Sequence, residues 1–258
     1  MKRFILFFSL LLSVFATNAQ NNANDSQCEK FFIGIINTPR NTAYNFLSFD
    51  VSDYLRNPSP NDSRAHIPLS DNSLSLPNWG LNVGMTAPIN RDFDFMLDLQ
   101  FSFGNSFNFL IFAGSTFNVI KTNIFSFGPT AKLGFTYSKI ELGKVTVSGA
   151  SSVVNTENGA YYSGDDLSAS LYGVAYQLGC TGICKIKKNL SLIGQIGIGG
   201  AYLGLMSIDV THESDDPFKI DLSSKDCVEV GRYKQVDFTP KVKSYGFYYN
   251  LGVAFNID

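Results

Sequence analysis

Only two side chains in this sequence could act as a general base near neutral pH, His66 and His212. His212 is followed directly by Glu213 and Ser214, so three residue types of an acyl-transfer site stand together. A catalytic triad is defined by its geometry in space, however, and neighbours on one loop are a poor source of that geometry. We therefore expect no enzyme activity and no cofactor, and we keep an acyl-transfer enzyme as the less favoured alternative.

The four cysteines offer a second possible chemistry. Cys180 and Cys184 have the spacing of half a metal site, but no second ligand pair follows, so no metal is expected. In an exported chain these cysteines can oxidise. The prediction is a disulfide between Cys180 and Cys184 across a turn in residues 181–189, with Cys28 as an alternative partner for either one and Cys227 unpaired.

Three charged residues, Asp94, Asp98 and Lys132, occupy positions that alternate with apolar ones. Such positions face inward if the apolar residues face lipid, and they share that side with Gln100, Gln177, Gln195 and Asn250. Charges enclosed in a narrow interior must pair or be hydrated. We predict that Asp94 or Asp98 pairs with Lys132 to fill the interior; the alternative is a polar conduit for small solutes.

The elements that would position these residues are best seen in residues 245–257. Phe247, Tyr249, Leu251, Val253 and Phe255 alternate there with small or amide side chains, which is the period of a β-strand. One face is bulky and apolar along its whole length, as in a barrel strand that faces lipid.

The same alternation recurs in residues 79–87, 93–103, 107–119, 125–137, 167–180 and 190–206, and residues 31–53 supply one further strand. Short turns (88–92, 121–123, 181–189) alternate with connections that include three long loops (54–77, 141–166, 207–244). Pro129 lacks an N–H and predicts a bulge or an unpaired edge. Two uncharged stretches could suggest membrane helices, but their glycines disfavour helix. The fold predicted is all-β: a transmembrane antiparallel up-and-down β-barrel of about eight strands.

The N-terminus has the form of an export signal, with Lys2 and Arg3 before an apolar run and small residues up to Ala19. We predict a cleaved signal peptide (1–19), a flexible leader (20–30) and a barrel domain (31–258). Without Lys2 and Arg3, 18 basic residues stand against 22 acidic ones, a net charge of −4. This acidic balance argues against a nucleic-acid partner.

The signal, the strand count and the aromatic terminal strand resemble the small outer-membrane β-barrel proteins of bacteria, the broad family that includes the OmpA and OmpX types. The resemblance implies a location in the outer membrane, contact with its lipids and lipopolysaccharide, and insertion by the barrel-insertion machinery. Some barrels of this kind modify lipid A, which gives the enzyme alternative its substrate class.

The expected function is a structural wall whose extracellular loops mediate surface interaction or adhesion. Phe218, Tyr233 and Phe238 are the candidate contact residues, because they lie within a loop that carries eight acidic and six basic side chains. A small-solute channel and a component of a secretion or assembly machine are the alternatives.

Overall fold

The computed structural model describes residues 29–37, 40–44, 49–51, 64–67, 79–103, 106–149, 153–156, 159–212, 217–220, 227–229 and 241–257. The predicted signal peptide and almost all of the predicted leader lie outside these residues. No helix in the described part of the chain is long and apolar enough to cross a membrane.

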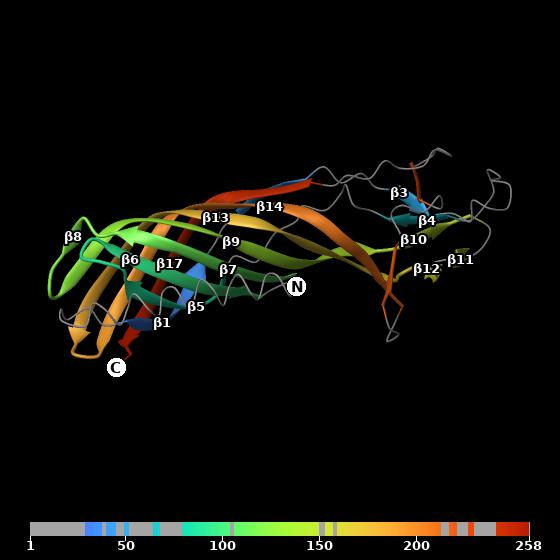
Figure 1. Cartoon of the computed structure of the whole chain (residues 1–258). Helices are drawn as coiled ribbons and strands as arrows, with labels where there is room; N and C mark the ends of the chain where they lie inside the picture. The colour runs from blue at the N-terminus through green and yellow to red at the C-terminus, as the bar shows by residue number, and fades with distance from the viewer. Residues whose placement is uncertain are drawn as a thin grey trace.

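Eight of the described strands form a closed antiparallel ring (Figure 1). Each pairs with the next in chain order, and the last pairs with the first, so the predicted up-and-down barrel is confirmed. The eight are β1 (Lys30–Asn37), β5 (Trp79–Pro88), β6 (Phe93–Ser102), β7 (Ser106–Phe117), β9 (Phe125–Lys144), β13 (Asp166–Lys187), β14 (Leu190–Thr211) and β17 (Lys241–Asn256).

The first strand of the ring is continued by β2 (Arg40–Tyr44). β2 pairs with β17 in the same register as β1 does. β1 and β2 together therefore serve as one strand of the ring, as predicted for residues 31–53. Pro129 lies where the pairing of β7 with β9 has just ended, at Thr116 and Thr130. Its missing N–H therefore costs no ladder bond on that side, and the predicted unpaired edge is confirmed.

Four strands run further than predicted. β9 extends to Lys144, and β17 begins at Lys241. β13 extends to Lys187, so the predicted turn of residues 181–189 shrinks to Lys188 and Asn189. β14 extends to Thr211 across a shift of register, in which Ser170 pairs with Ser207 but Leu171 pairs with Leu205. The extra residue, Met206, exchanges the inward and outward sides. The strand predicted from alternation stopped at that residue.

The outside of the barrel is apolar. In β17, Phe247 and Leu251 are 70% and 67% exposed, whereas Asn250 between them is 3% exposed. Tyr249 and Phe255 are also exposed and Val253 is partly exposed, so the predicted lipid-facing side of this strand is confirmed.

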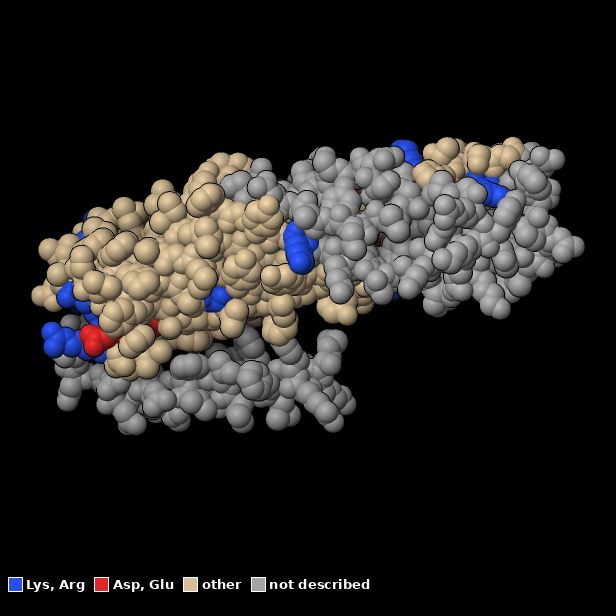
Figure 2. All heavy atoms as spheres, turned by 90° about the horizontal axis from the view of Figure 1, so that it is seen from above, with Lys and Arg blue, Asp and Glu red and all other residues tan. Residues whose placement is uncertain are grey.

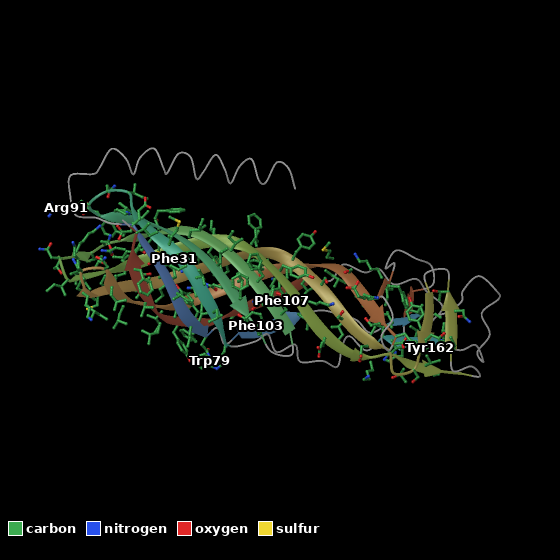
Figure 3. All side chains as sticks on the ribbon, turned by 90° about the horizontal axis from the view of Figure 1, so that it is seen from below. Phe31, Trp79, Arg91, Phe103, Phe107 and Tyr162 are labelled. Carbon is green, nitrogen blue, oxygen red and sulfur yellow. The ribbon has the colours of Figure 1, made fainter. Side chains whose placement is uncertain are left out.

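Aromatic pairs mark the two rims of this exterior (Figure 3). Phe93 packs on Phe117 at one rim and Phe103 on Phe107 at the other, with ring centroids 5.0 and 5.9 Å apart. The ten steps of strand from Phe93 to Phe103 span about 33 Å, or about 25 Å along the membrane normal at the usual tilt, which matches the apolar band of a membrane barrel.

The described segments of the long connections lie at one end of the barrel, here called the loop end (Figure 1). Three of these connections contribute to one four-stranded sheet, ordered β10 (Thr146–Ser148), β4 (Arg64–Ile67), β3 (Phe49–Val51) and β16 (Cys227–Glu229). β11 (Val153–Thr156) and β12 (Gly159–Tyr162) form the hairpin predicted around residues 158–159. β15 (Phe218–Lys219) extends the barrel beside β14. The opposite, turn end carries short turns and β8 (Ile120–Lys121), which pairs with β9.

Candidate functional site

The turn-end half of the interior contains a layer of polar side chains, beside a small apolar cluster of Phe32, Met96, Ile183, Ile193 and Ala254. Inward positions of alternating strands place amides, hydroxyls and charges there because the apolar positions of the same strands face outward. These buried polar residues are Asn82, Asp94, Asp98, Gln100, Thr116, Thr130, Lys132, Gln177, Thr181, Gln195 and Asn250.

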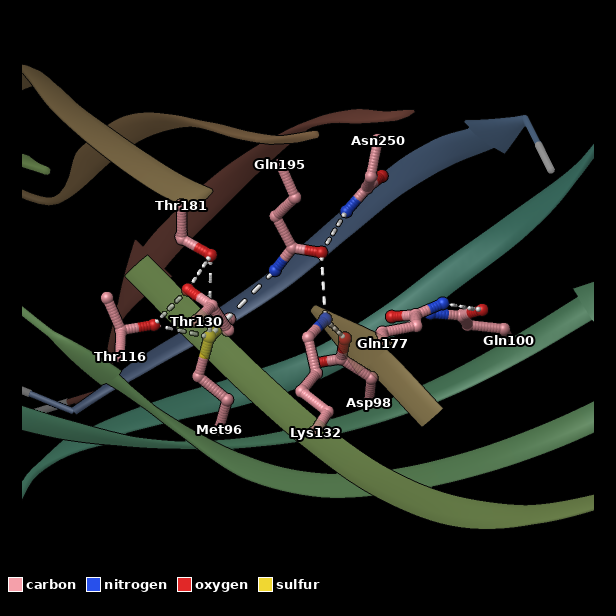
Figure 4. Close-up of polar contacts among 10 residues, drawn as sticks. All are labelled: Met96, Asp98, Gln100, Thr116, Thr130, Lys132, Gln177, Thr181, Gln195 and Asn250. Carbon is pink, nitrogen blue, oxygen red and sulfur yellow. Dashed lines mark hydrogen bonds and ion pairs between the residues drawn. The ribbon is translucent and has the colours of Figure 1, made fainter. Parts of the chain in front are cut away.

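An ion pair lies at the centre of this layer (Figure 4). The Lys132 ammonium donates to the Asp98 carboxylate, and both side chains are completely buried. Lys132 Nζ also donates to Gln195 Oε1 at 3.0 Å and lies 5.8 Å from the Tyr248 ring centre. Asn250 Nδ2 donates to the same Gln195 oxygen at 3.4 Å. The chain of contacts thus crosses the interior from β6 through β9 and β14 to β17.

Asp94, the other carboxylate considered for Lys132, lies nearer the turn end. It accepts a hydrogen bond from Lys121 Nζ at 3.0 Å. Sequence reasoning missed Lys121 as a partner, since it had placed this residue in a turn. Its position follows from β8, which folds back along β9 and returns the lysine to the mouth of the barrel.

One further pair of side chains bridges the interior, and a line of hydroxyls from three neighbouring strands runs along its wall. Gln100 on β6 and Gln177 on β13 exchange amide hydrogen bonds of 3.3 and 3.1 Å. Thr116, Thr130 and Thr181 form a line of hydroxyls with oxygens 2.7 Å apart. Side chains from opposite walls therefore meet at this level, as expected for a narrow eight-strand barrel.

Several buried polar atoms in this layer have no protein partner among the described residues. They are both amide atoms of Asn82, the second carboxylate oxygen of Asp98, Asn250 Oδ1 and the Tyr248 hydroxyl. Buried polar atoms of this kind are normally satisfied by internal water. We therefore expect internal water to complete the hydrogen bonds of this layer.

Apolar side chains fill much of the interior from the level of Asp98 toward the loop end, although Asn108 and Ser138 are also buried there. Leu110, Phe112, Leu171 and Leu203 are buried there and belong to one cluster that continues into the folded loops. Loop members include Val51, Ala65, Ile67, Val154, Tyr161 and Ile220. Sequence reasoning missed this cluster because these strands carry apolar residues on both faces, so alternation gives no contrast there.

Histidines at the loop end lie beside carboxylates. His212 Nδ1 is 2.6 Å from Asp165 Oδ1, and its ring stacks on Tyr162 with centroids 4.1 Å apart. His66 Nδ1 is 2.9 Å from Asp50 Oδ1. Glu213 and Ser214, the predicted neighbours of His212, lie outside the described residues. The structure thus gives His212 a carboxylate partner from a different loop.

Of the three predicted loop contact residues, one lies within the described residues and two lie outside them. Phe218 is half-buried and packs edge-on against Tyr161, with ring centroids 5.1 Å apart, so it contributes to the loop-end cluster. Tyr233 and Phe238 lie outside the described residues.

The predicted disulfide between Cys180 and Cys184 is wrong. Both cysteines are free and lie on the single continuous strand β13. Four residues of strand separate their Cα atoms by about 13 Å, twice the reach of a disulfide. Cys28, the alternative partner, lies outside the described residues. In the described part of the chain, no group of three or more His, Cys, Asp or Glu side chains could hold a metal ion.

Comparison with known proteins adds a likeness of fold. No protein-family model matches the chain. No curated protein matches its sequence.

Solved structures that do match include a major outer membrane protein from Thermus thermophilus (10% identity, 89% of this chain, 99% of that chain, TM-score 0.43). Another is the outer membrane protease OmpT from Escherichia coli (7% identity, 89% of this chain, 97% of that chain, TM-score 0.41). A third is the outer membrane protein OprG from Pseudomonas aeruginosa (10% identity, 90% of this chain, 97% of that chain, TM-score 0.40). At such identities the likeness concerns the fold alone.

The chain's own geometry carries the architectural conclusion. A closed antiparallel ring, an apolar exterior of membrane height and a polar layer inside together make an outer-membrane β-barrel.

Proposed function

We propose that this protein is a closed outer-membrane barrel, of the small type that resembles OmpA and OmpX, whose wall is structural and whose loops form one folded surface for interaction with other molecules. The observation that carries the proposal is the four-stranded sheet at the loop end. Its strands come from three connections that are far apart in the chain. Loops that only covered the barrel would have no need of a shared sheet.

The apolar cluster supports a closed interior. Phe112, Leu110 and Leu171 are at most 1% exposed inside the wall, and they form one cluster with loop residues such as Ile67 and Tyr161. A water-filled path would have to displace this cluster, which would expose apolar surface to water. The cross-interior contacts of Lys132 and Gln177 obstruct the turn-end half.

Planar-bilayer recording of the purified, refolded barrel tests closure. We expect no steady open conductance in the wild type. The polar layer favours the rival function, a conduit for small solutes, and a steady conductance would establish that rival. Replacing Leu171 and Leu203 together by alanine is the gain-of-function control, since both belong to the apolar cluster and neither pairs in register with a residue of the polar layer.

The interaction surface is tested by replacing residues 215–237 with a scrambled sequence of the same composition. If this loop makes specific contacts, cells that display the scrambled variant should lose adhesion or the recovery of cross-linked partners. Equal binding by the scrambled and native loops would contradict a specific surface. Recovery of envelope proteins at the turn end would instead favour a role in a secretion or assembly machine.

Export and catalysis complete the proposal. We propose that residues 1–19 are removed on export, that the barrel-insertion machinery inserts the mature chain, and that outer-membrane lipids and lipopolysaccharide surround it. The mass of the mature protein should correspond to a chain that begins at Gln20.

We also propose no enzyme activity. Lipid A mass spectra should be the same for the wild type, a His212→Ala variant and a deletion strain, and a difference would indicate a lipid-modifying enzyme.

A further inference from the structure

The turn-end tip of the β13–β14 hairpin carries three lysines in four residues, two of them at the end of β13 and one in the turn. Lys185, Lys187 and Lys188 are all exposed, and the hairpin that holds them lies at the turn end of the barrel. Figure 2 shows basic side chains at this end, with acidic side chains beside them, and only scattered charged side chains along the described wall.

Both neighbouring strands hold this turn in place. The backbone N–H of Lys185 donates to the Ile124 carbonyl oxygen at 2.7 Å, on the side of β9. On the side of β17, Asn256 Nδ2 donates to the Lys188 carbonyl oxygen at 2.9 Å. The backbone N–H of Asn256 also reaches the Asn189 carbonyl oxygen, at 3.3 Å. The three ammonium groups therefore extend from a backbone that is fixed on two sides.

Among the described residues near the turns, basic side chains outnumber carboxylates. Within the described residues near the turns, Lys30, Arg91 and Lys121 join the three hairpin lysines, and the carboxylates are Glu29, Asp92 and Asp94. Asp94 is already paired with Lys121. A local excess of positive charge attracts anions that approach from the membrane surface or from water.

The position of the lysines indicates which anion. Ile186, between them, is 51% exposed and Leu192 on the paired strand is 42% exposed, so the apolar exterior continues up to the turn. The rings of Phe125 and Phe127 stack on the same wall, at the start of β9. Lipid phosphates lie where the hydrocarbon ends, and lysines at that boundary can reach them while their carbon chains contact acyl chains.

We propose that Lys185, Lys187 and Lys188 form a binding surface for the phosphate headgroup of an anionic phospholipid in the leaflet at the turn end. The proposal rests on the membrane placement of the barrel given above. A soluble acidic protein fits less well, because the adjoining wall of Ile186 and Leu192 would then face water.

The test is native mass spectrometry of the full mature barrel in a neutral detergent, titrated with phosphatidylglycerol or phosphatidylcholine. The variant is Lys185→Gln/Lys187→Gln/Lys188→Gln. The matched control is Lys139→Gln/Lys144→Gln/Lys243→Gln, which removes three exposed lysines toward the loop end. Wild type and control should bind phosphatidylglycerol at least about tenfold more tightly than phosphatidylcholine, and the hairpin variant should lose most of this preference.

A wild type without preference, a hairpin variant that keeps it, or a control that loses it equally would overturn the proposal. So would displacement of the lipid by millimolar inorganic phosphate or by poly-glutamate, since either would indicate a site for a soluble anion. The heat-dependent gel mobility of each variant shows whether the barrel has folded. A barrel that needed no detergent would instead refute the membrane placement itself, so the two failures are distinguishable.

Discussion

Lys132 is the residue on which the interior network depends, because its ammonium contacts groups from three other strands. Asp98 supplies the charge, Gln195 an amide oxygen and Tyr248 a ring face. Because the Lys132 side chain is completely buried, an ammonium group at this position without these partners would be strongly disfavoured. The ion pair of Lys132 and Asp98, with the other contacts of the ammonium, therefore also constrains the relative positions of β6, β9, β14 and β17.

Replacing Lys132 by methionine should leave the buried Asp98 carboxylate uncompensated and lower the free energy of unfolding by about 3–5 kcal/mol. The double variant Lys132→Met/Asp98→Leu should recover most of this loss, since no charge then remains without a partner. Guanidinium unfolding of the refolded barrel in lipid measures both. Equal losses in the single and double variants would show that packing, and not charge, dominates.

At the scale of the element, β17 closes the ring and presents a side to lipid. Leu251 lies five residues from Asn256, the end of the strand, with Phe247 and Phe255 on the same face. The opposite face, with Tyr248 and Asn250, is buried in the polar layer. A strand of this kind tolerates a charged side chain poorly on its lipid-facing side and better on its inward side.

Leu251→Arg should destabilise the barrel by about 2–4 kcal/mol if Leu251 faces the middle of the bilayer. Lys243→Arg, which keeps a charge near the loop end of the same strand, is the control and should change stability little. Unfolding in phospholipid vesicles gives both values. A similar stability for Leu251→Arg and wild type would mean that this side does not meet hydrocarbon.

The four-stranded sheet at the loop end is the second element for which the structure predicts the effect of a substitution. Ile67 on β4 is completely buried in the apolar cluster, although its strand has only four residues. Ile67→Asp should therefore unfold the loop sheet while the ring of eight strands persists, because a buried unpaired charge is costly.

Limited proteolysis measures this effect. The variant's long connections should be cut much faster than those of the wild type, while the gel mobility of the folded barrel is kept. Protection equal to wild type would contradict a loop sheet that depends on this core.

At the scale of the whole molecule, the exposed apolar wall decides how the protein behaves in solution. Large apolar side chains are exposed on the outward faces of the ring strands, among them Leu133, Phe247 and Ile196. A surface of that extent is incompatible with a dispersed monomer in water.

The mature protein should therefore need detergent or lipid to stay dispersed, and its circular dichroism there should be that of β-sheet. Analytical ultracentrifugation with and without detergent checks the first point. A compact, monodisperse protein in buffer alone would contradict a membrane-facing wall.

The sequence by itself determined the eight ring strands and the side of each that faces lipid. These depend on a period of two residues, which a single chain displays wherever its two faces differ in polarity, as in Phe247 and Asn250. Only the tertiary structure decided which carboxylate reaches Lys132, that Cys180 and Cys184 lie along one strand, and that three loops share a sheet. Those outcomes depend on register, on the bulge beside Met206 and on which distant strands become neighbours when the ring closes, and no local pattern records them.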